Sequence, residues 1–103
     1  MIPSLAERRA DIAALCRRYH VQRLDVFGSA ARGDDFDPTR SDADFVVDFE
    51  PDHAPPDLSD FLALREALAA LLGRPVDLAM TAGIRNPYLR AAIEQSRENI
   101  YAA

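Results

Sequence analysis

The sequence lacks the features that mark several large classes of protein. Its single cysteine excludes an internal disulfide bond and a cluster of thiolate metal ligands. No apolar run approaches the length of a membrane-spanning helix, and the residues from Met1 to Ser4 have neither the basic nor the apolar segment of a secretory signal. We therefore expect a cytoplasmic protein that makes no contact with a membrane.

Positive charge is scarce as well. Lysine and arginine number 12 against 17 aspartates and glutamates, which gives a formal net charge of −5. Because a protein that binds a nucleic-acid backbone needs a basic face, we expect no direct nucleic-acid partner. Small phosphate ligands remain compatible with this composition, since a metal ion can supply positive charge locally.

The length and the pattern of apolar residues predict one domain over residues 1–103, without repeats or a linker. Leu58 is expected on the buried stripe of one helix, and Leu89, Ala92 and Ile93 on that of another. The expected helices run from Ser4, in a capping box, to about Tyr19, from Asp57 to Leu72 and from Asn86 onward; the expected strands cover 24–27, 42–50 and 75–80, with an extended segment at 99–101.

Two aspartates open the strand expected at residues 42–50. Because side chains alternate between the two faces of a strand, Asp42 and Asp44 should project together, opposite the apolar Phe45. Two adjacent carboxylates repel each other, and a fold mainly keeps such a pair when a cation neutralises it. Oxygen ligands of this kind suit Mg²⁺, which shares its coordination with substrate phosphates. Asp42 and Asp44 are therefore candidate metal ligands.

Gly28 and Ser29, at the end of the preceding strand, are candidate phosphate ligands. Glycine lets the backbone approach a ligand closely, and a short helix opened by Ser29 would turn free N–H groups toward a phosphate. These residues meet the aspartates only if the two strands are antiparallel, since in parallel neighbours they would lie at opposite edges of the sheet. The sequence therefore predicts an antiparallel pair joined by a loop from Ala30 to Ser41 that contains one helical turn. A phosphate cradle beside metal carboxylates indicates phosphoryl or nucleotidyl transfer.

Asp77 interrupts an apolar strand, in which Val76 and Leu78 face the opposite way. It is either a solvated residue of an edge strand or a third carboxylate beside Asp42 and Asp44. Because all three acids oppose the apolar faces of their strands, we interpret Asp77 as the third member of the site.

Other reactive side chains have structural interpretations. Cys16 lies on the apolar stripe of the first helix and is expected in the core, and His20, next to the end of that helix, is expected to interact with its dipole. His53 falls in a proline-rich loop with neither a cysteine nor a second histidine near it, so we expect no zinc site there. The acidic loop residues Asp34, Asp35 and Asp37 are interpreted as solvated turn residues.

Taken together, the motifs resemble those of a known family. Gly28-Ser29, Ala31-Arg32-Gly33, Ser41-Asp42-Ala43-Asp44 and Val76-Asp77-Leu78 are similar to the motifs of the minimal nucleotidyltransferases of the DNA-polymerase-β-like superfamily. The length and the ending, Asn86-Pro87-Tyr88-Leu89-Arg90 and then Ile100-Tyr101, resemble the MNT-type antitoxins, which are usually encoded beside a HEPN-type toxin. The twelve residues between Ser29 and Asp42 make a longer gap than this family usually shows, and the insertion falls in the loop.

The resemblance implies a fold, a reaction and residue roles. The expected fold is α/β of the α+β type: a small mixed sheet of three to four strands, the first two antiparallel, flanked by about four helices. The expected activity is the Mg²⁺-dependent transfer of AMP from ATP to a tyrosine hydroxyl of a HEPN-type toxin, which silences the toxin. In this family Asp42, Asp44 and Asp77 would bind Mg²⁺, and Gly28 and Ser29 would hold the terminal phosphates of ATP.

Some roles and two other functions stay open at this point. Asp77 could receive the proton of the hydroxyl, and Arg32 either contacts a phosphate or forms a surface ion pair. A binding-only antitoxin would instead neutralise its toxin by occlusion, and either kind of antitoxin is expected in a hetero-oligomer. Nucleotidyl transfer to a small molecule is the third alternative, although a chain of 103 residues leaves little surface for such a pocket.

Overall fold

The structure is a computed structural model that describes residues 3–32 and 42–103. None of the helices in these two ranges is long and apolar enough to cross a membrane. The elements follow the order α1 (Pro3–Glu7), α2 (Arg9–Arg18), β1 (Val21–Phe27), α3 (Ser29–Arg32), β2 (Ala43–Phe49), the 3-10 turn η1 (Pro51–His53), α4 (Leu58–Leu72), β3 (Val76–Met80), the 3-10 turn η2 (Thr81–Gly83), α5 (Pro87–Ser96) and β4 (Glu98–Ala102).

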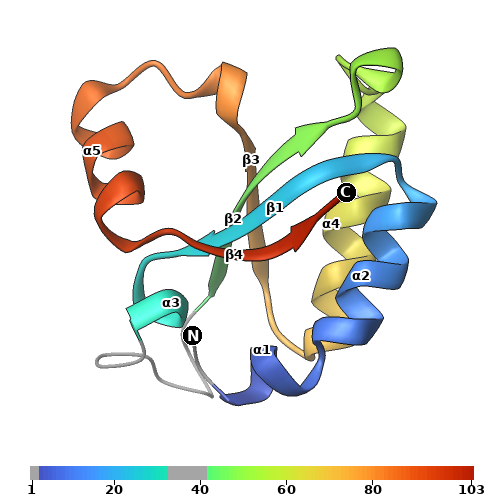
Figure 1. Cartoon of the computed structure of the whole chain (residues 1–103), viewed down its shortest axis with the longest axis horizontal. Coiled ribbons are helices and arrows are strands. Elements are labelled where there is room, and N and C mark those ends of the chain that lie inside the picture. Colours follow the sequence, from blue (N-terminus) through green and yellow to red (C-terminus); the bar gives the residue numbers. More distant parts are fainter. Residues whose placement is uncertain (1–2, 33–41) are drawn as a thin grey trace.

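The strands form a mixed sheet in the order β3-β2-β1-β4 (Figure 1). β1 lies antiparallel to both β2 and β4, whereas β2 lies parallel to β3. Helices α2 and α4 pack against one face of the sheet, and α5 lies on the other side (Figure 1). The predicted fold class is therefore confirmed, together with the antiparallel first pair of strands and the extended segment near the C-terminus.

The main core lies between the sheet and the two longer helices. Alternate residues of β2 point into it, and Phe45 and Val47 are fully buried there, each worth roughly 1.5–3 kcal/mol of apolar burial. A second cluster on the opposite face contains Val46, Ile84 and Ile93. Because β2 is buried on both faces, the segment that carries Asp44 is held from two sides.

Two predicted helix boundaries are confirmed. The Asn86 side-chain oxygen accepts hydrogen bonds from the backbone N–H groups of Tyr88 at 2.9 Å and Leu89 at 3.4 Å, and so caps α5. α4 ends at Gly73, whose φ of 67° lies in the left-handed region that favours glycine. The Gly73 N–H group donates to the carbonyl oxygen of Ala69 at 2.8 Å.

The first helix differs from the prediction. The structure divides the expected helix from Ser4 to Tyr19 into α1 and α2, and Ser4 lies inside α1 instead of preceding it. The break falls at Arg8 (φ −97°, ψ 8°), whose N–H group donates to the Leu5 carbonyl oxygen at 3.1 Å in a turn tighter than an α-helical one. Leu5 still reaches the core on the far side of this turn.

Two predicted helix faces also differ. Leu58 is 71% exposed because it begins α4, one turn before Phe61 makes the first contact of this helix with the core. On α5, Ile93 is buried, whereas Leu89 is 44% exposed and Ala92 is exposed as well. Helix α5 therefore reaches the sheet with its C-terminal half only.

Candidate active site

Three aspartates lie at the N-terminal ends of two neighbouring strands. The parallel register of β2 and β3 pairs Asp44 directly with Asp77, and Asp42 immediately precedes β2. Asp44 is half-buried, whereas Asp42 and Asp77 are exposed. β3 is an edge strand, so both interpretations of Asp77 hold in part: it lies in an edge strand, and it lies beside Asp44. The structure thus brings the three predicted carboxylates together, and their role as metal ligands stays a prediction.

The turn after β1 approaches this group of acids closely. The antiparallel register pairs Phe27 with Asp44, so Gly28 follows directly beside the carboxylate. Gly28 has a φ of 69°, and a Cβ atom added to it would lie 3.0 Å from Asp44 Oδ2. Only glycine fits both the backbone conformation and the space. The predicted meeting of turn and carboxylates is therefore present.

The electrostatics of the three acids favour a bound cation. Burial, a hydrogen bond with Asp77 and the negative charges of Asp77 and Asp42 together raise the pKa of Asp44 to about 6, and burial has the largest effect. The ionised form of Asp44 is therefore destabilised by its surroundings, and a bound divalent cation would offset that effect. The donor set consists of carboxylate oxygens, which is the ligand type that Mg²⁺ prefers. The residues present therefore fit the predicted ion.

The predicted helical turn after Gly28 is confirmed as α3. Ala30 and Ala31 are buried and anchor it, and the Ala31 N–H group donates to the Gly28 carbonyl oxygen at 3.1 Å. The side chains of Ser29 and Arg32, and residues 33–41 with their acidic cluster, lie outside the described part of the chain. The predicted phosphate contacts of Gly28, Ser29 and Arg32 stay predictions.

Ser96, near the end of α5, is a residue that the sequence did not single out. Its Oγ accepts a hydrogen bond from the Gly28 N–H group at 3.0 Å, and its own hydroxyl donates to the Ala92 carbonyl oxygen at 3.1 Å. A serine that bonds back to the fourth preceding carbonyl looks, in sequence, like any other helical serine. Its contact with a turn 68 positions away appears only in the fold.

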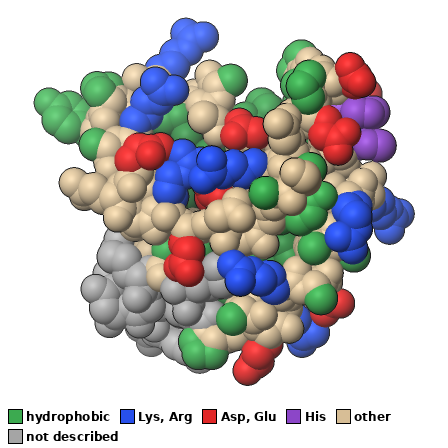
Figure 2. All heavy atoms as spheres, in the orientation of Figure 1, with side chains coloured by type: hydrophobic (Ala, Val, Ile, Leu, Met, Phe, Trp, Pro, Cys, Tyr) green, Lys and Arg blue, Asp and Glu red, His purple; other side chains and the backbone are tan. Residues whose placement is uncertain are grey.

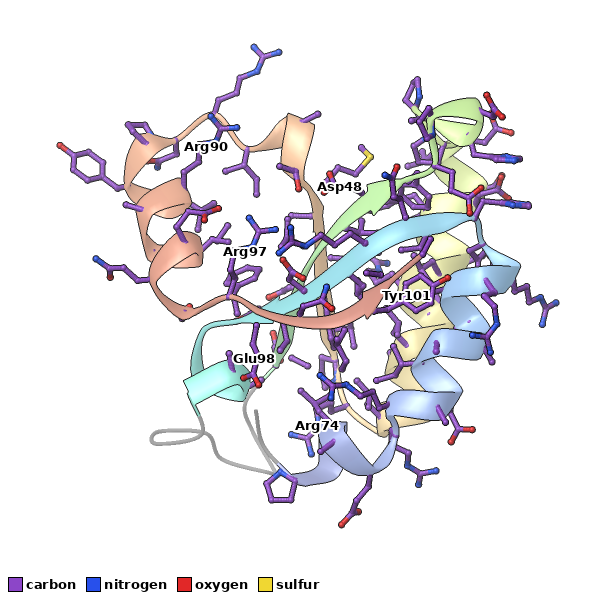
Figure 3. All side chains as sticks on the ribbon, viewed as in Figure 1. Asp48, Arg74, Arg90, Arg97, Glu98 and Tyr101 are labelled. Carbon is purple, nitrogen blue, oxygen red and sulfur yellow. The ribbon has the colours of Figure 1, made fainter. Side chains whose placement is uncertain are left out.

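A buried ion-pair network lies on the face of the sheet that also carries Asp44. Asp25 of β1 is fully buried and accepts hydrogen bonds from Arg97 Nε at 2.7 Å, Asn99 Nδ2 at 2.9 Å and Arg23 Nε at 3.1 Å. Arg97 also bonds to Glu94 at 2.6 Å, and Figure 3 shows its side chain between α5 and the strands. This network joins the start of β4 and the end of α5 to the middle of β1.

Burial by itself would raise the pKa of Asp25, but the hydrogen bonds from Asn99, Arg23 and Arg97 and the Arg97 charge outweigh it and lower that pKa. Asp25 is therefore ionised and structural. The signal that could have found it is the one that marked Asp77: a single acid between apolar residues of a strand, here Leu24 and Val26.

Of the other reactive residues, Cys16 is buried as expected, and burial raises the pKa of its thiol to about 12 despite the opposing charge of Arg17. The interpretation of His53 rested on a wrong premise. His53 is exposed as expected, but its ring stacks on that of His20, with centroids 3.7 Å apart and planes 4° from parallel. A second histidine therefore does lie near it, brought there by the pairing of β1 and β2.

A family model and the similar proteins of known sequence all point to nucleotidyltransferases. Residues 12–100 match the model of the nucleotidyltransferase domain. The chain is 38% identical over 87 residues to the protein adenylyltransferase MntA of Thermococcus cleftensis, covering 84% of this chain and 80% of that protein. It is 37% identical over 81 residues to a Methanocaldococcus jannaschii protein provisionally named a protein adenylyltransferase, covering 79% and 78%.

Solved structures share the fold. A crystal structure of a toxin–antitoxin with AMP-PNP gives a TM-score of 0.71 at 22% identity, over 92% of this chain and 73% of that chain. A structure of a tri-AMPylated Shewanella oneidensis HEPN toxin in complex with an MNT antitoxin gives 0.68 at 19% identity, over 96% and 73%. At these identities the similarity establishes the architecture around the carboxylates.

Proposed function

The chain belongs to the nucleotidyltransferase family, and on that premise we propose that it transfers AMP from ATP to a tyrosine hydroxyl of a HEPN-type toxin. The observation that carries the proposal is the group of Asp42, Asp44 and Asp77 beside the side-chain-free turn at Gly28. Two further findings support it: the similarity to the adenylyltransferase MntA, and a fold shared with structures of toxin–antitoxin complexes. In this role the chain is the antitoxin of the pair and associates stably with its toxin in the cytoplasm.

The three carboxylates would hold Mg²⁺ together with the phosphates of ATP. The bound ion supplies positive charge that stabilises the entering oxygen and the departing pyrophosphate. Asp44 would be the innermost of the three ligands, since it is the half-buried member and lies against the Gly28 turn. The Gly28 backbone lets the triphosphate come close to this carboxylate, because a side chain there would fill the space.

The acceptor hydroxyl would enter from the open side of the site. Its oxygen bonds to the α-phosphorus of ATP, the bond from that phosphorus to the bridging oxygen breaks, and pyrophosphate leaves with the bonding electron pair. Asp77 is exposed and next to Asp44, so it can take the proton of the hydroxyl. The exposed Asp42 and Asp77 leave room for a side chain presented by another protein.

The transfer itself is tested by weighing the partner. The chain and its candidate HEPN-type partner are incubated with ATP and Mg²⁺, and the HEPN-type protein is examined by intact mass spectrometry. We expect it to gain the mass of AMP on tyrosine, with no gain when Asp44→Asn replaces the wild type. A tight complex without a gain in mass would contradict transfer and favour neutralisation by occlusion. A protein that neither binds nor gains mass would contradict both antitoxin functions and favour a small-molecule acceptor.

The dependence on the cation is tested by calorimetry of ATP binding with and without a chelator. Without a cation the carboxylates repel the triphosphate, so we expect ATP binding to be lost in the chelator. Equal ATP affinity in both conditions would contradict the assignment of Asp42, Asp44 and Asp77 as metal ligands.

A further inference from the structure

The end of the β1–β2 pair that lies away from Gly28 carries three potential metal ligands on a hydrogen-bonded backbone. His20 precedes β1, Glu50 follows β2, and His53 ends η1. The Glu50 N–H group donates to the His20 carbonyl oxygen at 2.9 Å, and the His53 N–H group donates to the Glu50 carbonyl oxygen at 2.8 Å. Two consecutive backbone bonds therefore hold the three residues together, independently of their side chains.

The three side chains also converge. One ring nitrogen from each histidine and one carboxylate oxygen of Glu50 all lie within 4.8 Å of one another. His20 adopts a φ of 60°, a left-handed conformation that histidine adopts more readily than most residues, and this turn directs its ring onto that of His53. Within the described residues, the half-buried Glu50 carboxylate forms neither a hydrogen bond nor an ion pair with another side chain, although two imidazoles lie beside it.

We infer that His20, Glu50 and His53 form a binding site for one divalent cation of the zinc class. Two imidazoles and one carboxylate, with water in the fourth position, are a well-matched ligand set for Zn²⁺. With metal–ligand bonds of about 2.0–2.2 Å, tetrahedral donors lie about 3.3 Å apart. Binding therefore draws the three donor atoms together by an ångström or so, and the stacked rings must fan apart so that the ion lies in both ring planes. Both rings are exposed and can turn about their side-chain torsions without disturbing the core.

The surroundings favour a cation. The site opens onto a hollow of about 220 Å³ that is also lined by Asp52, Asp57 and Asp60. These carboxylates provide negative potential without filling the space that a water ligand needs. Figure 2 shows the two histidines beside acidic side chains at one edge of this face of the molecule.

This site is separate from the aspartates of the candidate active site. β1 and β2 are each seven residues long, which places roughly 20 Å of strand between Glu50 and Asp44. A cation bound here would cross-link the turn before β1, through His20, to the segment that leads into α4, through His53. The inference therefore does not depend on the proposed transfer reaction, and we expect the ion to act on stability.

The test is a zinc titration of the full chain without a histidine tag, in an Asp42→Asn, Asp44→Asn background that weakens metal binding at the other site and leaves Asp77 on the edge strand. Competition with a chromophoric chelator should give one tight Zn²⁺ per chain, and Co²⁺ should give the visible absorption of a four-coordinate ion. His20→Asn, which keeps a residue that tolerates the left-handed turn, and His53→Ala should each weaken zinc binding by more than about tenfold. Zn²⁺ should raise the Tm of the background protein, and neither His variant should show this rise.

Asp52→Asn is the matched control, because it removes a carboxylate from the same hollow but not a proposed ligand. It should retain one tight site and the cobalt spectrum. Zinc binding that is absent from the background protein, or equal in the background protein and in both His variants, would overturn the inference. A loss as large in Asp52→Asn as in His53→Ala would also overturn it, since the field of the hollow, and not the three ligands, would then hold the ion.

Discussion

At the scale of single residues, the site combines neighbouring carboxylates with a glycine that leaves space beside them. Asp44 lies against another carboxylate of the neighbouring strand and against a turn that has no side chain. Both arrangements cost stability in the protein without a ligand: the first by repulsion, the second by the conformational freedom of glycine. A bound cation would offset the repulsion, and a bound phosphate would use the space beside the glycine. The effect of each residue on stability can be measured.

Removing the crowded charge should stabilise the protein. Because the folded pKa of Asp44 is raised above its unfolded value, the favourable effect of its protonated form is complete below about pH 4 and is lost as pH rises through about 6. In a chelator at pH 7, Asp44→Asn should therefore increase the free energy of unfolding by roughly 1–2 kcal/mol after allowance for solvent screening. The gain should disappear at pH 4 in urea titrations.

The control is Asp48→Asn, which removes a charge near the other end of the same strand. It should change stability by less than about 0.5 kcal/mol at either pH. A destabilised Asp44→Asn protein at pH 7 would show that the carboxylate is held by favourable contacts and not by crowding.

Gly28→Ala should abolish nucleotidyl transfer and lower stability. The added methyl group meets Asp44 Oδ2 at 3.0 Å and sits on a φ of 69°, which costs about 1–2 kcal/mol for the left-handed conformation alone. Gly73→Ala separates the two effects, because Gly73 has nearly the same φ, 67°, and nothing within 4 Å of an added Cβ atom. We expect Gly73→Ala to lose stability and keep the transfer rate. Equal transfer rates in the two variants would mean that the close approach at Gly28 has no part in the reaction.

At the scale of elements, α5 and β4 support the turn and the strand that carry the site. Ser96 Oγ accepts a hydrogen bond from the Gly28 N–H group, and Arg97 and Asn99 both donate hydrogen bonds to the Asp25 carboxylate of β1. The last elements of the chain therefore position residues contributed by the first strand. Substitutions in α5 should therefore change the transfer rate although α5 contributes none of the proposed metal ligands.

Ser96→Ala should slow transfer while leaving the fold intact. The Gly28 N–H group loses its partner, which costs about 1 kcal/mol and frees the turn that approaches Asp44. Ser59→Ala, in an exposed position of α4, is the control and should change neither stability nor rate. Because Ser96 acts through Gly28, which is expected to lie against the phosphates of ATP, its loss should lower kcat and also weaken ATP binding in steady-state assays. An unchanged kcat in Ser96→Ala would contradict the inference that α5 positions the Gly28 turn.

Asp25→Asn should be the most destabilising of these changes. Breaking a buried ion pair by neutralising one partner costs about 3 kcal/mol, since Arg97 then loses its buried counter-charge and keeps only its pair with the exposed Glu94. The lowered pKa of Asp25 means that its contribution is fully present above its unfolded pKa near 4 and is lost as pH falls below it. The stability difference between wild type and Asp25→Asn should therefore be constant from pH 5 to 7 and shrink in acid-denaturation experiments.

Asp11→Asn is the matched control, because it breaks an exposed pair with Arg8 at 3.8 Å. Its cost should be below about 0.5 kcal/mol. A loss of similar size in the two variants would contradict the structural role assigned to the buried network.

Local patterns were sufficient to bring Asp42, Asp44 and Asp77 together, but they did not show the break of the first helix at Arg8 or the buried Asp25. The alternation of Asp42, Asp44 and Phe45 fixes which side of β2 is polar, and the need to bring Gly28 to Asp44 demands an antiparallel pair. Contacts between distant residues were beyond these patterns. The stacking of His20 on His53 and the bond from Gly28 to Ser96 depend on how strands and helices assemble. The exposed Leu89 was misplaced because periodicity does not say how much of a helix its neighbours cover.

At the scale of the whole molecule, the negative charge should guide association with the partner that we propose. The net charge of −5 favours a partner with a basic surface, and long-range attraction acts mainly on the rate of encounter. We expect the association rate with the HEPN-type protein, measured by stopped flow, to fall about tenfold or more between 0.05 and 0.5 M NaCl, with a smaller change in the dissociation rate. A rate that does not depend on salt would argue against a basic docking surface on the partner.

The position of β3 at the edge of the sheet has a consequence for solubility. An edge strand presents unpaired backbone N–H and C=O groups on which another chain can assemble, and natural proteins often protect such edges with a charged residue. Of the five residues of β3, Asp77 alone is charged, between the apolar Val76 and Leu78. The carboxylate that we assign to the reaction therefore also discourages edge-to-edge aggregation. Neutral substitutions of Asp77 expose a short apolar edge, so in this chain the reaction chemistry and the resistance to aggregation constrain the same side chain.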